Sequence, residues 1–250
     1  MTTRPASAVR VLKFGDWTEF TRDAFVELFG DGIFRHGRYL FRGSADADYD
    51  LRSHFDRRFA TVPTERRMAL WHRLVQEWRR GCEEAGVDPD LLAEDRTLWA
   101  LGQHYGLPTR LLDWSTSPYV AAFFAFADHL ARTPERFAHV AVWALHLDNP
   151  VWSRPDGVEV VTVPTVRNDR LRAQGGRFTL CRTSFSSLEE YVEQHAEGVA
   201  LTKCVLPAVA AARALPDLDA MGITSAELFA DLGGTATLAT MRAVLQSDLL

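Results

Sequence analysis

Hydrophobic residues recur every three or four positions in several parts of the chain, which is the spacing of helices that bury one face. The clearest stripe begins near Thr64 and stops at Gly86, and its members are Met68, Trp71, Val75, Trp78 and Cys82. The same reasoning predicts a helix over 16–30, closed by glycine, and another over 88–101.

Shorter apolar or alternating runs predict β-strands between these helices. They cover 39–41, 110–114, 137–147, 158–163, 178–181 and 200–206. The residues before Asp16 are expected to form only a short tail, and the residues after Pro207 are expected to be mainly helical, with a turn at Gly233 and Gly234. The pattern predicts one α+β domain with a helical insert near 60–105 and a helical tail near 208–250.

Most residues able to do chemistry lie in the stretch 103–129, QHYGLPTRLLDWSTSPYVAAFFAFADH. Gly106 is expected to end a helix, and the strand that follows leads into a turn rich in hydroxyl groups. Ser117 can cap the next helix, for which Pro118 suits the first position. The start of a buried helix favours anions, so the turn is a candidate seat for a phosphate or a sugar hydroxyl. The alternative is that these hydroxyls only cap a core helix.

Other candidate residues flank this stretch. Arg42 and Gly43 follow an early strand, and an arginine there offers donors that match a phosphate or a carboxylate; the alternative is a surface arginine in an ion pair. Gln174 stands just before two glycines, which suggests close approach of a ligand or of another loop. His104 is expected at the mouth of the site, and Asp113 either takes part in it or pairs with Arg110 to hold the strand.

Composition narrows the function classes. The 250 residues carry a formal net charge of −5, so broad nucleic-acid binding is not expected. A chain of this net charge can still carry a local basic patch. Cys82, Cys181 and Cys204 are isolated, which indicates neither a disulfide framework nor a zinc site and predicts a reducing, cytoplasmic setting. No run is apolar enough for a membrane span, and no signal peptide is recognisable. The common phosphate-loop, dinucleotide, zinc-protease and nucleophile-elbow motifs are absent.

Four blocks are similar to the bacterial FRG domain family. They are YLFRGS at 39–44, HYGLPTRLLDWSTSPYVAAFFAF at 104–126, RLRAQGGRF at 170–178 and ELFADLGG at 227–234. The resemblance implies a single FRG domain over 1–250.

The first three blocks also resemble, less extensively, the motif order of ADP-ribosyltransferases of the arginine, Ser-Thr-Ser, glutamate type. This resemblance implies a split β-sheet core and a protein that uses NAD as its substrate, without a metal. It would cleave the nicotinamide–ribose bond and transfer ADP-ribose to an unknown acceptor. The catalytic residues implied are Arg42, Ser115 and Gln174. The cofactor-binding residues implied are Gly43, His104, Tyr105, Arg110, Thr116 and Ser117.

One departure from that pattern concerns the residue that stabilises the developing cation. Gln174 stands where active arginine-specific transferases have a carboxylate, and a neutral amide stabilises an oxocarbenium-like cation less. Either turnover is lost or another carboxylate takes the role, and the candidates are Asp113, Glu189, Glu190 and Glu193.

Two other classes of function stay open. One is a non-catalytic module that binds NAD or a nucleotide derivative, which Gln174 would favour. The other is a hydrolase in which His104 activates Ser115 and Asp113 orients the histidine. The biological setting that the family resemblance suggests is a toxin or a phage-defence effector.

Overall fold

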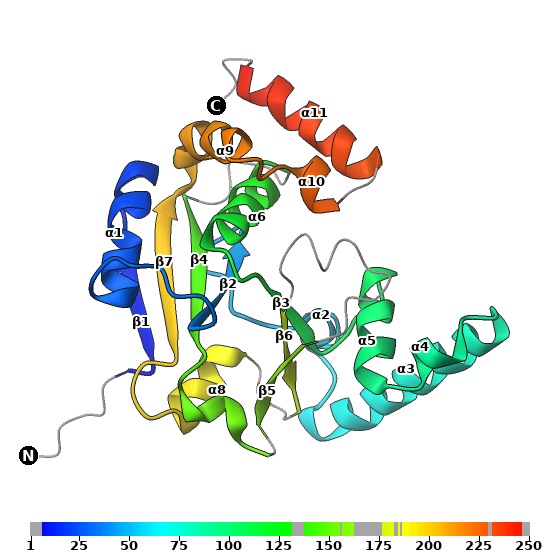
Figure 1. Ribbon diagram of the computed structural model, residues 1–250. Coiled ribbons are helices and arrows are strands. Elements are labelled where there is room, and N and C mark those ends of the chain that lie inside the picture. The colour runs from blue at the N-terminus through cyan, green and yellow to red at the C-terminus, as the bar shows by residue number, and fades with distance from the viewer. Residues whose placement is uncertain are drawn as a thin grey trace, which may run out of the picture.

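The computed structural model describes residues 7–131, 138–155, 157–162, 177–182, 185, 187–229 and 232–246, and this part of the chain is a mixed α+β structure with two β-sheets (Figure 1). Its strands are β1 (Val9–Lys13), β2 (Tyr39–Ser44), β3 (Leu111–Trp114), β4 (His139–His146), β5 (Val158–Val161), β6 (Arg177–Cys181) and β7 (Leu201–Pro207). Its helices are α1 (Trp17–Phe29), α2 (His54–Arg58), α3 (Thr64–Glu84), α4 (Pro89–Leu92), α5 (Asp95–His104), α6 (Pro118–Ala131), α8 (Leu188–His195), α9 (Ala211–Ala220), α10 (Ser225–Phe229) and α11 (Leu232–Gln246).

In the described part of the chain, one isolated β-bridge connects the two sheets. One sheet has the order β1-β7-β4-β2, with β1 parallel to β7 and the other pairs antiparallel; the second is antiparallel with the order β3-β6-β5. Phe41 of β2 and Ser115, just after β3, exchange two backbone hydrogen bonds of 2.7 Å each. The strand that carries Arg42 is therefore fixed against the start of the hydroxyl-rich turn.

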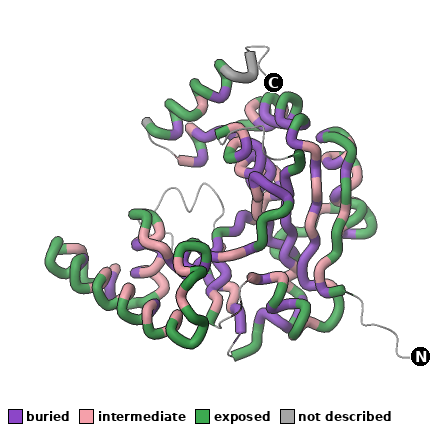
Figure 2. Tube along the Cα trace, turned by 180° about the vertical axis from the view of Figure 1, so that it is seen from behind, coloured by how far each residue is buried: buried purple, intermediate pink, exposed green. Residues whose placement is uncertain are grey.

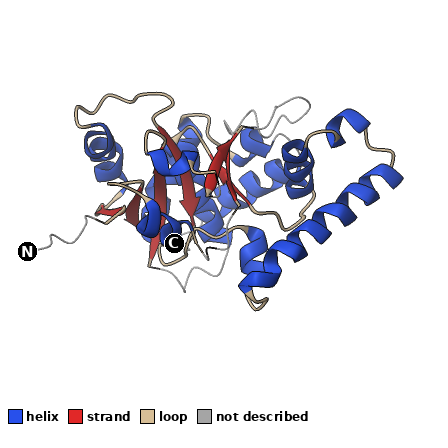
Figure 3. Ribbon diagram, turned by 90° about the horizontal axis from the view of Figure 1, so that it is seen from below, coloured by secondary structure: helices blue, strands red, loops and turns tan. Residues whose placement is uncertain are grey.

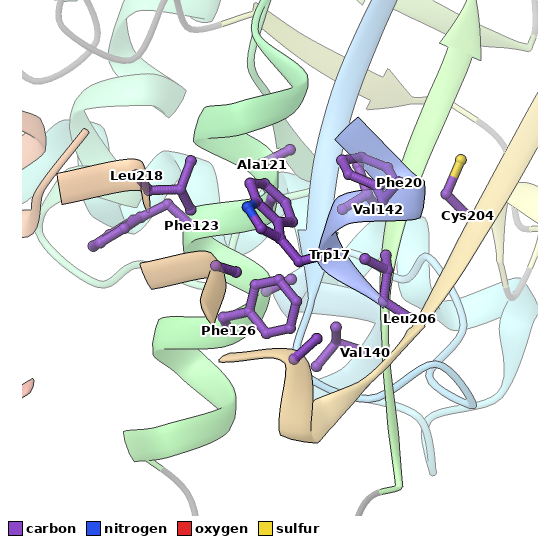
Figure 4. Close-up of a cluster of buried hydrophobic side chains, with 14 of the residues drawn as sticks. Trp17, Phe20, Ala121, Phe123, Phe126, Val140, Val142, Cys204, Leu206 and Leu218 are labelled. Atoms are coloured by element: carbon purple, nitrogen blue, oxygen red, sulfur yellow. The ribbon is translucent and has the colours of Figure 1, made fainter. Parts of the chain in front are cut away.

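Hydrophobic side chains fill both faces of the four-stranded sheet. On one face, Trp17 of α1 and Phe126 of α6 pack against Val140, Val142 and their neighbours (Figure 4). On the other face a second cluster includes Trp143 of β4 and Tyr191 of α8. The central strands β4 and β7 are accordingly buried along most of their length, whereas β1 at the edge of the sheet is not (Figure 2).

Gly43 lies at a close contact between β2 and α6. A Cβ atom at this position would lie 2.6 Å from the backbone nitrogen of Ala125 and closer still to the carbonyl oxygen of Ala121. The absence of a side chain is thus needed for the packing of α6 on β2, a reason that the sequence alone did not reveal.

Capping by a side chain is confirmed at Ser117, and it also occurs at Asp16 and Ser187. The side chains of Asp16, Ser117 and Ser187 accept hydrogen bonds from backbone N–H groups three residues further on, at 2.8, 3.3 and 3.2 Å. The helix stripe that starts at Thr64 is confirmed as α3, whose Trp71 and Cys82 are buried.

The structure corrects other predictions. The segment before Asp16 is not only a tail, because Val9–Lys13 forms β1 and pairs with β7. The single helix predicted over 88–101 is divided into α4 and α5 at Ala93 and Glu94.

The predicted turn at the two late glycines is also wrong, because they lie inside α11. A Cβ atom at Gly234 would meet Phe229 at 2.9 Å and the carbonyl oxygen of Ser225 at a shorter distance. The glycine therefore serves close packing of α10 on α11, and a glycine pair in sequence did not distinguish this role from a turn.

The helices α2 to α5 lie beside the three-stranded sheet, and α3 extends away from both sheets (Figure 3). None of the helices in the described residues is both long enough and apolar enough to cross a membrane.

Candidate functional site

Arg42 and Asp113 meet where the two sheets join. Arg42 Nη1 donates a 2.8 Å hydrogen bond to the backbone carbonyl of Asp113 and lies 3.8 Å from Oδ2 of the same residue. The Arg42 side chain keeps 23% of its surface exposed. Its guanidinium group is thus anchored at one nitrogen while part of it remains accessible to a ligand.

Gln103 completes this arrangement and was not foreseen as a site residue. Its Nε2 donates a 2.6 Å hydrogen bond to Asp113 Oδ1, and its Oε1 accepts a hydrogen bond from the hydroxyl of Thr109. The two bonds fix the orientation of the amide, so Gln103 holds the carboxylate from the end of α5. A possible sequence signal was its position directly before the block that begins at His104.

The protein environment changes the acidity of Asp113. Desolvation raises the pKa of its carboxyl group, and the nearby positive charges of Arg42 and Arg57 oppose that rise. Because 56% of the side chain is exposed, solvent limits the desolvation. The carboxylate is therefore open to a ligand while it faces a guanidinium group.

The hydroxyl-rich turn lies at the start of α6. Ser115 is 6% exposed, and its Oγ accepts a 3.1 Å hydrogen bond from the backbone nitrogen of Ser117. Ser117 caps α6 in turn, whereas Thr116 is only partly buried. The capping alternative is thus confirmed for Ser117, and the turn still lies beside the strand that carries Arg42.

His104 and Tyr105 lie on the surface at the end of α5, and Tyr105 is 71% exposed. Their rings contact each other edge-on, with centroids 5.2 Å apart. In the described part of the chain, His104 forms no hydrogen bond with Ser115 or Asp113. The serine–histidine–aspartate relay of a hydrolase is not assembled in this arrangement.

Arg110 lies in the interior, with 1% of its surface exposed. Its guanidinium is 3.8 Å from a carboxylate oxygen of Asp56 and lies over the ring of Phe55. It borders a cavity of about 560 Å³ that also has Trp71 and Trp99 in its wall, and Arg42 does not line this cavity. The described contacts therefore place Arg110 in the support of β3. Its ion pair is with Asp56, whereas pairing with Asp113 was one of the two alternatives for that residue.

Two of the remaining candidates, Glu189 and Glu193, contact other segments of the described structure. Gln174 lies outside the described residues. Glu189 accepts hydrogen bonds of 3.0 and 3.1 Å from the backbone of Leu51, and burial raises the pKa of its carboxyl group. Glu193 binds the backbone nitrogen of Val9 at 3.1 Å, so both carboxylates are engaged with backbone groups of other segments.

Two of the blocks noted in the sequence thus converge on one junction. The first block supplies the end of β2, and the second supplies the end of α5 and the turn before α6. Residues 37–133, which contain all of them, match the family model of the FRG domain. The chain therefore carries an FRG domain in this segment. No curated protein and no solved structure matches the chain.

Among the described residues, no group of three or more histidine, cysteine, aspartate or glutamate side chains is arranged to hold a metal ion.

Proposed function

We propose that this chain is an ADP-ribosyltransferase-like protein that uses NAD as its substrate. The observation that supports this proposal most is the bridge between Phe41 and Ser115, which brings Arg42 and the Ser-Thr-Ser turn to one junction. In the transferase pattern, an early arginine and a Ser-Thr-Ser motif hold opposite parts of NAD. The proposal needs these two motifs to be neighbours.

The layout of the two sheets agrees with this proposal. A split core consists of two sheets that meet along one edge. Here β2 and β3 belong to different sheets, and a bridge between Phe41 and Ser115 connects them. The partly exposed guanidinium of Arg42 offers donors for a phosphate oxygen. The backbone N–H groups at the start of α6 add a partial positive charge. Both features suit the anionic pyrophosphate of NAD.

The proposed reaction breaks the bond between the ribose and nicotinamide. Nicotinamide leaves with the bonding electron pair as a neutral molecule, and the ribose becomes an oxocarbenium-like cation. A nucleophilic oxygen or nitrogen of the acceptor then forms the new bond at that carbon and loses its proton to solvent. A carboxylate near the ribose would stabilise the cation, and Asp113 is the described carboxylate that faces Arg42.

One observation favours a second candidate, the non-catalytic module that binds NAD or a nucleotide derivative. Asp113 already interacts with Gln103 and Arg42, which reduces its capacity to stabilise a further positive charge. With Gln174 as a neutral amide, the site would then hold the ligand without cleaving it.

The test is a calorimetric titration of the protein with NAD and with ADP-ribose, in which nicotinamide release is followed in the same samples. Binding with release supports the transferase, and binding without release supports the binding module. Arg42→Ala is expected to abolish binding under both, whereas the control Arg22→Ala, on an exposed arginine of α1, leaves binding unchanged. Wild-type protein that binds neither compound would refute both proposals.

A further inference from the structure

Residues 57–73 form a locally basic segment in a chain of net acidic charge. Residues 57–73 contain five arginines and one glutamate, although the chain carries a net charge of −5. We call this arginine set the basic face, and its members are Arg57, Arg58, Arg66, Arg67 and Arg73.

The basic face covers α2 and the first half of α3. Trp71 is buried on the inner side of α3, whereas Arg66 and Arg73 are exposed. These two arginines are seven residues apart, so they lie on the same side of the helix about 10 Å from each other along its axis. The exposed side of α3 can be followed in Figure 2, and Figure 3 shows that the helix stands clear of the sheets.

Three of the five arginines of the basic face are not neutralised by a described carboxylate. Arg58, Arg66 and Arg73 form no ion pair with another described residue, and Arg67 donates to the backbone carbonyls of Ala60 and Val62. Further along the same helix the situation differs: Arg79 pairs with Asp95, and Arg80 pairs with Glu77.

This charge distribution does not serve the stability of α3. A helix is stabilised by acidic residues near its start and basic residues near its end. Here three arginines lie in the first half of α3, and Glu83 and Glu84 occupy the last turn. The segment 81–95 continues with six acidic residues and no lysine or arginine. The net charge of the helical region thus changes from positive over 57–73 to negative over 81–95.

The basic face adjoins that site through α2. The backbone nitrogen of Phe55 donates a 3.0 Å hydrogen bond to the carbonyl of Thr109, the residue that also holds Gln103. The charge of Arg57 acts on the carboxyl group of Asp113 and lowers its pKa against the effect of burial. A polyanion that reaches Arg57 would therefore extend from the basic face toward Asp113.

We propose that the basic face binds the phosphate backbone of a nucleic acid. Resting on the proposed function, the nucleic acid would be the acceptor of ADP-ribose. Guanidinium groups bind phosphates through paired hydrogen bonds, and a row of them along one helix face matches a repeating anion. A membrane surface fits less well, because interfacial helices place large apolar side chains beside their basic residues. Within 57–73 none of the described large hydrophobic side chains is exposed.

The experiment measures fluorescence anisotropy of labelled single-stranded RNA, single-stranded DNA and duplex DNA with the full chain, at several salt concentrations. The test variant is Arg58→Gln/Arg66→Gln/Arg73→Gln. The control variant, Arg22→Gln/Arg213→Gln/Arg242→Gln, removes the same charge from exposed arginines on α1, α9 and α11. Glutamine keeps helix propensity close to that of arginine, and thermal melts confirm folding of both variants.

The test variant is expected to bind the preferred nucleic acid about 100-fold more weakly at 0.1 M salt, with the slope of log K against log salt reduced by about 2. The control variant is expected to stay within about twofold of wild type. Wild-type protein that binds none of the three nucleic acids would overturn the proposal, and so would an equal loss in both variants. Binding of the wild type to phosphatidylserine vesicles but not to nucleic acid would assign the basic face to a membrane and also overturn it.

The nicotinamide assay separates this inference from the proposed function. Nucleic-acid binding that depends on the basic face, without any NAD binding, would keep the nucleic-acid site and reject the transferase. Nicotinamide release without nucleic-acid binding would keep the transferase and reject the nucleic acid as its acceptor.

Discussion

Gly43→Ala tests whether Gly43 is needed for the packing of α6 on β2. The new methyl carbon would lie 2.6 Å from the nitrogen of Ala125, inside the 3.0 Å limit that real Cβ atoms respect, and closer still to the carbonyl oxygen of Ala121. Both obstacles are backbone atoms of a buried helix, so relief requires α6 to move away from β2 rather than a side chain to rotate. Overpacking of this kind costs about 3 kcal/mol, the upper end of the usual range. For a chain of this size, that cost lowers the melting temperature by about 6–12 °C.

The assay is urea unfolding followed by circular dichroism, with Gly81→Ala as the matched control. Gly81 lies inside α3, and its Cβ position has no neighbouring atom within 4 Å. Alanine is a better helix former than glycine, so the control is expected to gain about 0.5–1 kcal/mol. The packing argument is refuted if Gly43→Ala unfolds within about 0.5 kcal/mol of wild type. If it keeps full stability and loses NAD binding, Gly43 is a ligand contact instead.

Three further predictions concern charge and capping. Burial, aided by Arg10 and Arg38, lowers the pKa of His146 to about 4. The unfolded chain therefore takes up the proton first, and stability is lost as pH falls from about 6.5 to about 4, by up to about 3 kcal/mol. In His146→Gln, urea unfolding across this range should show a shallower pH dependence; an unchanged slope would contradict the assignment. Asp113→Asn is expected to lower nicotinamide release about 100-fold if its charge stabilises the cation, with NAD affinity changed much less. Equal release rates would exclude that role. Ser187→Ala removes the cap of α8 and is expected to cost about 1 kcal/mol in the same unfolding assay, and no loss would show that the cap contributes nothing.

Local signals in the sequence were sufficient for most elements. The caps at Asp16, Ser117 and Ser187 depend on hydrogen bonds between residues three positions apart, so residue type and spacing define them. The apolar stripe of α3 is likewise a local pattern. The mixed α+β class follows from such patterns, because they reveal which segments are helices and which are strands.

Long-range packing was not readable in the same way. β1 exists through its pairing with β7, whose residues lie almost two hundred positions further on. Its five residues, VRVLK, are partly exposed and are too few to predict a strand from their pattern. Gly234 looked like a turn residue because its close contact with α10 appears only in the folded chain. Arg110 was assigned to the site from its neighbours in sequence, whereas its side chain lies beside Asp56 in the interior.

Only part of the candidate site was predicted, because some of its contacts depend on the fold and not on a local sequence pattern. Arg42 and the Ser-Thr-Ser turn were identified from the motifs that contain them, and the bridge at Phe41 brings the two motifs together. Gln103 was missed, because an amide becomes a positioning group only through the partners at its two ends, here Asp113 and Thr109.

The pairing of β2 and β3 with strands from later in the chain determines what the matched segment can do in isolation. Residues 37–133 include both strands, yet β4 and β6, which carry their ladder hydrogen bonds, lie beyond its end. Excised from the chain, the segment would expose two unpaired strand edges and the apolar side of α6 that packs on β4 and α9. The unit that sequence comparison identifies is therefore smaller than the unit that folds, and expression of the matched segment alone is expected to give aggregated protein.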